Sequence, residues 1–161
     1  MRNTVLVTAR VRIREAGASD SVQLLPLARA LATSYEVDAA AFTAVLNAQL
    51  AAPTGLVLVA EQQHQIVGYA LAQLHQTFHA NGPVVWVEEI LVEGQHQGAG
   101  IGRALMNEIE SWGKHRGAAY VALATRRAAS FYEALGYEPS ATYFKRALSP
   151  RSSPRAPNRV R

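Results

Sequence analysis

One stretch of the sequence decides the fold, and it reads Val92-Glu93-Gly94-Gln95-His96-Gln97-Gly98-Ala99-Gly100-Ile101-Gly102-Arg103-Ala104-Leu105. It starts at the end of an apolar run, passes through four glycines and leads into a segment with apolar residues at helical spacing. Glycines let the chain bend tightly without Cβ clashes, so that successive backbone N–H groups can point into one concavity. The helix that follows adds its own free N–H groups and the positive end of its dipole. We therefore expect this strand–turn–helix unit to bind a pyrophosphate.

Two common nucleotide-binding motifs do not fit this stretch. The Walker pattern ends in Gly-Lys-Ser/Thr, whereas the chain reads Gly100-Ile101-Gly102-Arg103, which argues against an NTPase. The dinucleotide fingerprint, started at Gly98, would need glycine in place of Arg103, and it belongs with the opening strand of a Rossmann domain. The pattern that does fit is Gln97-x-x-Gly100-x-Gly102 after a strand.

Length and composition limit the class of protein. The chain has 161 residues, of which 49% are hydrophobic and 17% charged, so we expect one domain with a real core. No apolar run approaches the roughly 20 residues that span a bilayer, and the N-terminus lacks the apolar centre of a secretory signal. Cysteine is absent, which excludes disulfides, thiolate metal sites and a thiol nucleophile. These features predict a cytoplasmic protein that does not contact a membrane.

The basic character of the chain comes from its C-terminus. The formal net charge is +4, and the segment 149–161 holds four arginines and no acidic residue. Without this segment, twelve basic residues balance twelve acidic ones. We expect residues 149–161 to form a disordered, solubilising tail, with a nucleic-acid-binding arm as the less favoured alternative.

Hydrophobic periodicity and turn residues predict a mixture of strands and helices. We expect strands over residues 11–14, 56–60, 66–72, 84–92, 120–124 and 143–148. We expect helices from Ser19 or Asp20 to about residue 31, from the cap Asp38 to residue 52, over 103–115 and over 128–135. Early hairpins and a late strand–helix–strand crossover indicate an α/β or α+β protein built on a mixed sheet.

A second segment supports a family resemblance. It reads Gly117-Ala118-Ala119-Tyr120-Val121-Ala122-Leu123 and then Arg127-Ala128-Ala129-Ser130-Phe131-Tyr132-Glu133-Ala134-Leu135-Gly136-Tyr137. Together with Gln97-x-x-Gly100-x-Gly102, it resembles the GNAT family of acetyl-CoA-dependent N-acetyltransferases. The resemblance is strongest over residues 84–138. It implies a single GNAT-like domain over 11–148, preceded by an N-terminal extension, 1–10, and followed by the tail.

The resemblance implies a fold and a co-substrate site. The fold is a mixed, mostly antiparallel sheet of about seven strands, with a splayed central parallel pair (84–92 and 120–124) that holds acetyl-CoA, and about four flanking helices. Thr125 stands where many relatives have asparagine, so a side-chain hydrogen bond at that position is expected to be weaker or absent. The implied acetyl-CoA-binding residues are Leu91, Val92, Gln97, Gly98, Ala99, Gly100, Ile101, Gly102, Arg103, Thr125 and Ala128.

Two kinds of residue are expected to move protons. By resemblance, Tyr132 protonates the departing CoA thiolate; the alternative is that it only packs in the core. Either Glu88 or Glu89 takes the proton of the amine, and the resemblance favours Glu88, because the first acid of such a pair is the usual candidate in relatives. Alternatively, the two carboxylates only attract a cationic amine. Strict strand alternation predicts that Trp86, Glu88, Ile90 and Val92 share one face, and that Val87, Glu89 and Leu91 share the other.

The resemblance implies direct transfer of an acetyl group from acetyl-CoA to a primary amine. The acidic pair favours a small cationic amine, although a protein N-terminus or lysine remains open. The alternative from another class is a non-catalytic module that binds acetyl-CoA as a sensor or scaffold. No metal is expected, because His75 and His79 follow a strand and lack a third ligand. A homodimer is compatible with the sequence.

Overall fold

The structure is a computed structural model, and it describes residues 10–148. The segments 1–9 and 149–161, which include most of the expected N-terminal extension and the whole basic tail, lie outside the described residues. No helix within residues 10–148 is long and apolar enough to cross a membrane. The elements in chain order are β1 (Arg12–Glu15), η1 (Ala18–Asp20), α1 (Ser21–Leu31), α2 (Ala39–Ala51), β2 (Gly55–Gln62), β3 (Gln65–Thr77), β4 (Gly82–Val92), η2 (Gly94–His96), α3 (Ile101–His115), β5 (Val121–Leu123) and α4 (Ala129–Glu133).

The strands form one mixed sheet in the order β1-β2-β3-β4-β5. The first three pairings are antiparallel, and β4 pairs with β5 in parallel. The prediction of a mixed sheet with four α-helices is confirmed, but the number of strands was wrong: the described chain has five, not about seven. Because β5 is an edge strand here, the parallel pair lies at the border of the sheet rather than at its centre.

The expected last strand, 143–148, is absent from the described chain. These residues have no regular structure, and Tyr143, Phe144 and Leu148 are exposed. The segment has no period-2 pattern, because two apolar residues are followed by the adjacent charges of Lys145 and Arg146. A strand also needs a paired neighbour, and the edge strand β5 offers only three residues.

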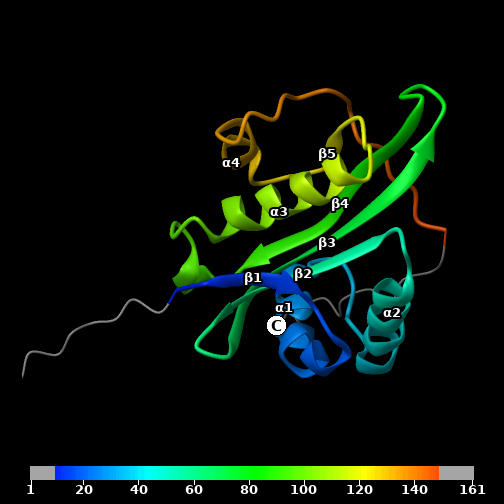
Figure 1. Cartoon of the computed structure of the whole chain (residues 1–161). Coiled ribbons are helices and arrows are strands. Elements are labelled where there is room, and N and C mark those ends of the chain that lie inside the picture. The colour runs from blue at the N-terminus through cyan, green and yellow to red at the C-terminus, as the bar shows by residue number, and fades with distance from the viewer. Residues whose placement is uncertain (1–9, 149–161) are drawn as a thin grey trace, which may run out of the picture.

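Helices cover both faces of the sheet (Figure 1), with α3 and α4 on one face and α1 and α2 on the other. The apolar stripe of α3 packs on the first face, where Leu105, Met106 and Ile109 are 0% exposed. On the second face, Leu24, Leu27 and Leu46 of the two early helices pack with Val57, Val59, Ile66 and Tyr69 of β2 and β3. The sheet therefore separates two apolar clusters.

Two aspartates organise the early helices in different ways. Asp38 caps α2 as predicted, since its Oδ2 accepts a hydrogen bond of 2.8 Å from the Ala41 N–H. Asp20 instead accepts from the Gly17 N–H and from the guanidinium of Arg14 on β1. Arg14 also binds Glu61 of β2 at 2.7 Å. Asp20 therefore ties the start of α1 to the edge of the sheet.

A β-bulge interrupts β4 at its acidic pair. Glu89 lies opposite Leu71 of β3, whereas Val87 lies opposite Ala72, so Glu88 has no residue opposite it. One extra residue shifts the alternation of side chains by one position. Accordingly, Val87 packs in the same cluster as Ile90 and Val92, and the expectation that Val87 lies on the opposite face from these two residues was wrong.

Candidate active site

A cavity of about 410 Å³ opens at the N-terminus of α3. Pairing between β4 and β5 stops at Val87 and Leu123, while β4 continues to Val92. The edge of β4 beyond Val87 therefore faces no neighbouring strand on that side within the described chain, and the cavity lies along it. The cavity is lined by Ile90, Val92, His96, Gln97, Gly98, Gly100, Ile101, Gly102, Arg103, Phe131 and Tyr132.

The glycine-rich loop presents a row of free donors to this cavity. Gly98 and Gly100 have φ angles of +80° and +82°, a left-handed conformation that favours glycine. None of the backbone N–H groups from Gly98 to Arg103 has an acceptor within residues 10–148, whereas the next one, Ala104 N–H, binds Gly100 O. Free N–H groups at the positive end of a helix fit an anion such as pyrophosphate.

Side chains around the loop brace it. The Gln97 Nε2 donates to the Val92 carbonyl at 3.0 Å, which ties the loop back to the end of β4. At Gly102, a Cβ atom would lie 3.0 Å from the ring of Phe131, so glycine allows α4 to approach the first turn of α3. Phe131 thus closes one side of the cavity.

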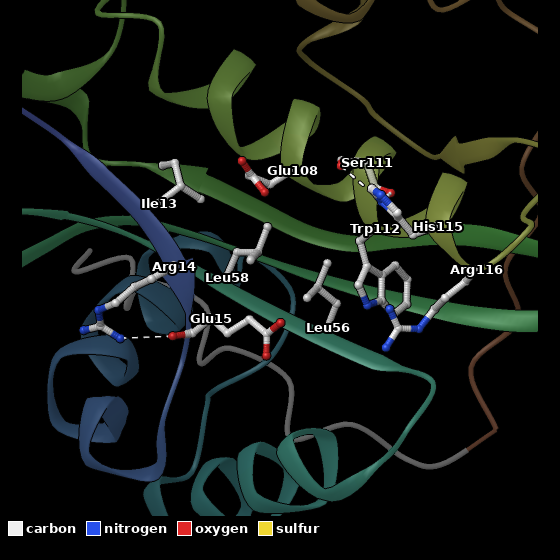
Figure 2. Close-up of a pocket in the computed structure, with 10 residues that line it drawn as sticks. All are labelled: Ile13, Arg14, Glu15, Leu56, Leu58, Glu108, Ser111, Trp112, His115 and Arg116. Atoms are coloured by element: carbon white, nitrogen blue, oxygen red, sulfur yellow. Dashed lines mark hydrogen bonds between the residues drawn. The ribbon is translucent and has the colours of Figure 1, made fainter.

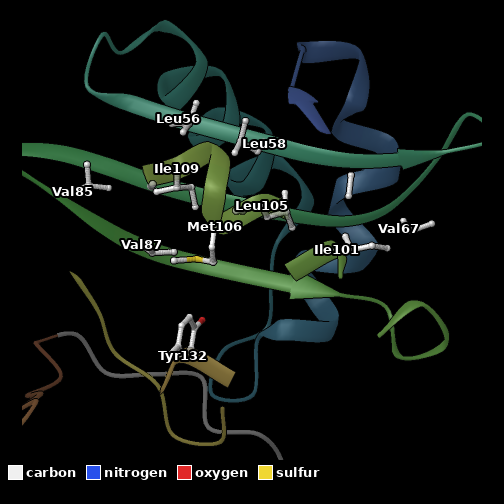
Figure 3. Packing of buried hydrophobic residues seen from close by; sticks show 13 residues of the cluster. Leu56, Leu58, Val67, Val85, Val87, Ile101, Leu105, Met106, Ile109 and Tyr132 are labelled. Atoms are coloured by element: carbon white, nitrogen blue, oxygen red, sulfur yellow. The ribbon is translucent and has the colours of Figure 1, made fainter. Parts of the chain in front are cut away.

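Tyr132, on α4, belongs to the core cluster (Figure 3). It also lines this cavity. It is 7% exposed, and its ring meets those of Phe131 and Tyr137 edge-on at centroid distances of 4.9 and 5.9 Å. Its hydroxyl has no hydrogen-bond partner among the described residues. Burial raises the pKa of Tyr132, so the hydroxyl keeps its proton at neutral pH.

The two carboxylates of β4 have different surroundings. Glu88, at the bulge, is exposed and has neither a hydrogen bond nor an ion pair within residues 10–148. Glu89 is half-buried, and its Oε2 accepts a hydrogen bond of 2.6 Å from the Tyr69 hydroxyl. Tyr69 and Leu91 belong to the cluster under α1 and α2, so Glu89 lies on the face opposite to Tyr132.

A second hollow, of about 260 Å³, lies between β1, β2 and the C-terminal half of α3 (Figure 2). Its apolar wall includes Ile13, Leu56, Leu58 and Trp112, and the guanidinium of Arg116 lies 4.6 Å from the Trp112 ring centroid. The nearby end of α3 carries the negative pole of the helix dipole and no free N–H groups. It is therefore less suited to phosphates than the cavity at the N-terminus.

Most of the residues expected to bind the co-substrate come together, but not all do. Val92, Gln97, Gly98, Gly100, Ile101, Gly102 and Arg103 line the cavity, whereas the side chains of Leu91, Ala99, Thr125 and Ala128 do not. Leu91 faces the other cluster, and the Thr125 hydroxyl accepts from the Ala128 N–H at 3.1 Å, a contact within the turn before α4.

Sequence reasoning did not assign Ile90 and Phe131 to the site. The signal for Ile90 was available, because strict alternation placed it on the same face as Val92; the bulge adds Val87 to that face. The signal for Phe131 was available, because it directly precedes Tyr132 in the second motif.

His96 and His79 lie in different environments. His96 lines the cavity, and its Nδ1 lies 3.3 Å from Glu93 Oε2 in a geometry that makes no hydrogen bond. His79, in the turn after β3, binds the Tyr120 hydroxyl at 2.8 Å through Nε2. Among the described residues, no three histidine or acidic side chains are grouped as metal ligands would be.

Comparisons with known proteins agree with this geometry. The family model described as "Acetyltransferase (GNAT) domain" matches residues 53–139. No curated protein matches the sequence significantly. Similar solved structures include an acetyltransferase of Trypanosoma brucei, with 23% identity and a TM-score of 0.76, covering 86% of this chain and all of that one.

Two further structures are named for their acceptors. Glucosamine-6-phosphate N-acetyltransferase from Arabidopsis thaliana has 18% identity and a TM-score of 0.78, over 87% of this chain and 99% of that one. The aminoglycoside N-acetyltransferase AAC(6')-Iy, solved in complex with CoA, has 22% identity and a TM-score of 0.79. The match covers 90% of this chain and 99% of that one. The family match spans more than half of the chain and includes the glycine-rich loop, Glu88, Glu89 and Tyr132. The chain therefore belongs to the GNAT family of acetyltransferases and is an acyltransferase enzyme.

Proposed function

We propose that this enzyme transfers an acetyl group from acetyl-CoA directly to a primary amine of a small cationic molecule. One observation carries the proposal: a single cavity joins the free N–H groups of residues 98–103 to the Tyr132 side chain along the open edge of β4. The loop holds the pyrophosphate, and the backbone of Leu91 and Val92 pairs with the pantetheine arm as a further strand would. Arg103, at the start of α3, adds a positive charge near the phosphates.

Tyr132 and the acidic pair supply the two proton transfers. The ammonium group of the acceptor loses its proton to a carboxylate of the Glu88–Glu89 pair, directly or through a water molecule. The amine nitrogen then forms a bond to the acetyl carbon as the carbon–sulfur bond breaks, and the Tyr132 hydroxyl protonates the departing thiolate. The nitrogen, which is now positively charged, releases its second proton to solvent. Tyr132 regains a proton from solvent, and the products are the acetamide, CoA and the proton of the former ammonium group.

The acidic pair favours a cationic acceptor. Glu88 is exposed at the bulge, where it can attract a positive charge from solution. Two of the similar structures are named for acetylating glucosamine 6-phosphate or aminoglycosides, which are amino-sugar compounds. We therefore place amino sugars and polyamines first among the candidate acceptors.

An amine panel tests the proposal. The wild-type protein is incubated with acetyl-CoA and, separately, with polyamines, amino sugars, amino-acid amides and a lysine peptide, and the acetylated product is identified by mass. We expect acceptor-dependent release of CoA with at least one small cationic amine. Tight binding of acetyl-CoA without any acetylated product would instead identify a non-catalytic sensor, and a product from the lysine peptide alone would overturn the small-amine assignment.

A further inference from the structure

Tyr69 and Glu89 meet on the face of the sheet that α1 and α2 cover. Glu89 lies opposite Leu71 on β3, and Tyr69, two residues earlier, lies opposite Leu91. Residues two apart on a strand share a face, so Tyr69 is the diagonal neighbour of Glu89. Pairing is regular from Glu89 to Val92, so Glu89 shares this face with Leu91 while Ile90 and Val92 face the cavity.

The contact between the two side chains is short and protected. The Tyr69 hydroxyl donates to Glu89 Oε2 at 2.6 Å, and Tyr69 is only 4% exposed. Burial, followed by the nearby charge of Glu89, raises the pKa of Tyr69 well above its usual range, so the phenol stays a donor at every working pH. The other oxygen, Oε1, makes no hydrogen bond within residues 10–148. One oxygen is therefore held and the other is available.

Glu88 lacks such support. It is exposed and has no hydrogen-bonding or charged partner in the described part of the chain, so its side chain can occupy several rotamers. A group that removes a proton must stay within hydrogen-bond reach of that proton. Orientation by a buried donor gives Glu89 this property.

We propose that Tyr69 is a positioning residue, whose hydroxyl holds the Glu89 carboxylate so that Oε1 receives the proton of the acceptor ammonium group. The inference rests on the proposed acetyl transfer, and it assigns the base within the acidic pair. Tyr132 belongs to the opposite apolar cluster. The amine therefore approaches from the α1–α2 face, while the thiolate is protonated from the α4 face.

A double-mutant cycle tests this inference. The variants are Tyr69→Phe, Glu89→Gln, their combination, and Glu88→Gln, assayed with acetyl-CoA and the amine of highest turnover from the panel. Tyr137→Phe is the matched control, because it removes a similar hydrogen bond, 2.8 Å long, from the Tyr137 hydroxyl to Glu110 Oε1. Thermal unfolding of each variant is measured alongside the kinetics.

We expect Tyr69→Phe to lower kcat by about 10- to 100-fold, with KM for acetyl-CoA changed by less than about twofold. In the Glu89→Gln background the same substitution should have almost no further effect, because Tyr69 acts only through Glu89. Tyr137→Phe should leave kcat within about twofold of the wild type. Glu89→Gln keeps Tyr69 intact, so it tests whether Glu89 accepts the proton even if Tyr69→Phe folds poorly.

Different outcomes would overturn different conclusions. If Tyr69→Phe lowers kcat by the same factor in the wild-type and Glu89→Gln backgrounds, Tyr69 acts through packing and not through Glu89. A large loss in Glu88→Gln with little loss in Glu89→Gln would assign the base to Glu88. Either result, with an active wild-type enzyme, refutes this inference and leaves the proposed function intact. A wild-type protein that acetylates no amine would refute both.

Discussion

Replacing Tyr132 with phenylalanine separates its chemical role from its packing role. The ring, which contacts Phe131 and Tyr137, stays in place and only the hydroxyl is lost. If that hydroxyl protonates the departing thiolate, kcat should fall by roughly 10²- to 10⁴-fold, which is about 3 to 5 kcal/mol of activation free energy. Because the hydroxyl has no partner among the described residues, the free energy of unfolding should change by less than about 1 kcal/mol.

The assay measures initial rates of CoA release at saturating acetyl-CoA, with urea unfolding of the same samples. Tyr137→Phe is the control with the opposite pattern: it loses the hydrogen bond to Glu110, so stability falls by up to about 1 kcal/mol while kcat is kept. A thioester with a more acidic thiol should narrow the difference in kcat between Tyr132→Phe and the wild type, because its thiolate leaves without needing a proton donor. Turnover of Tyr132→Phe within about threefold of the wild type, under 1 kcal/mol, would refute a proton-donating role.

Three further predictions concern the loop, the edge of the sheet and the core. Gly100→Val should weaken acetyl-CoA binding at least about tenfold by calorimetry, because φ is +82° at this position in the cavity. Gly117→Val is the control: φ is +73° there, so the strain is similar, about 1–2 kcal/mol, but the residue lies outside the cavity and acetyl-CoA should bind normally. Asp20→Asn should lower the free energy of unfolding by about 1–3 kcal/mol at pH 7. The Arg14 guanidinium lowers the pKa of Asp20, so this stabilisation is present above the unfolded pKa of about 3.9 and is lost as the pH falls through the folded pKa. Urea unfolding at pH 7 and pH 3 should therefore show the free energies of unfolding of wild type and Asp20→Asn converging at the lower pH. A difference that stays constant between the two pH values would contradict this. Met106→Ala, at a position 0% exposed, should cost about 2–5 kcal/mol in urea unfolding, and a loss below 1 kcal/mol would mean that the core refills the space.

Local features of the sequence were enough to predict the conformation of the glycine-rich loop and the helix after it. Gly98 and Gly100 adopt the left-handed conformations that their residue type favours, and the helix after them begins within two residues of its predicted start. The cap at Asp38 was also predicted correctly. These features depend on residues that are neighbours in the chain, so a single sequence contains the information that determines them.

The number of strands depended on contacts that are distant in the sequence. Residues 143–148 are rich enough in apolar side chains to resemble a strand, but strand formation requires a paired neighbour. In the described chain β5 is only three residues long, and the segment after α4 does not pair with it.

How the residues before the acidic pair face relative to those after it was decided by tertiary structure alone. Period-2 alternation placed Val87 and Ile90 on opposite faces, and the bulge at Glu88 brought them to the same one. The sequence of β4 contains no sign of the bulge, because a bulge is a property of the register between two strands. For the same reason, the hydrogen bond from Tyr69 to Glu89, twenty residues apart, appears only once β3 and β4 are paired.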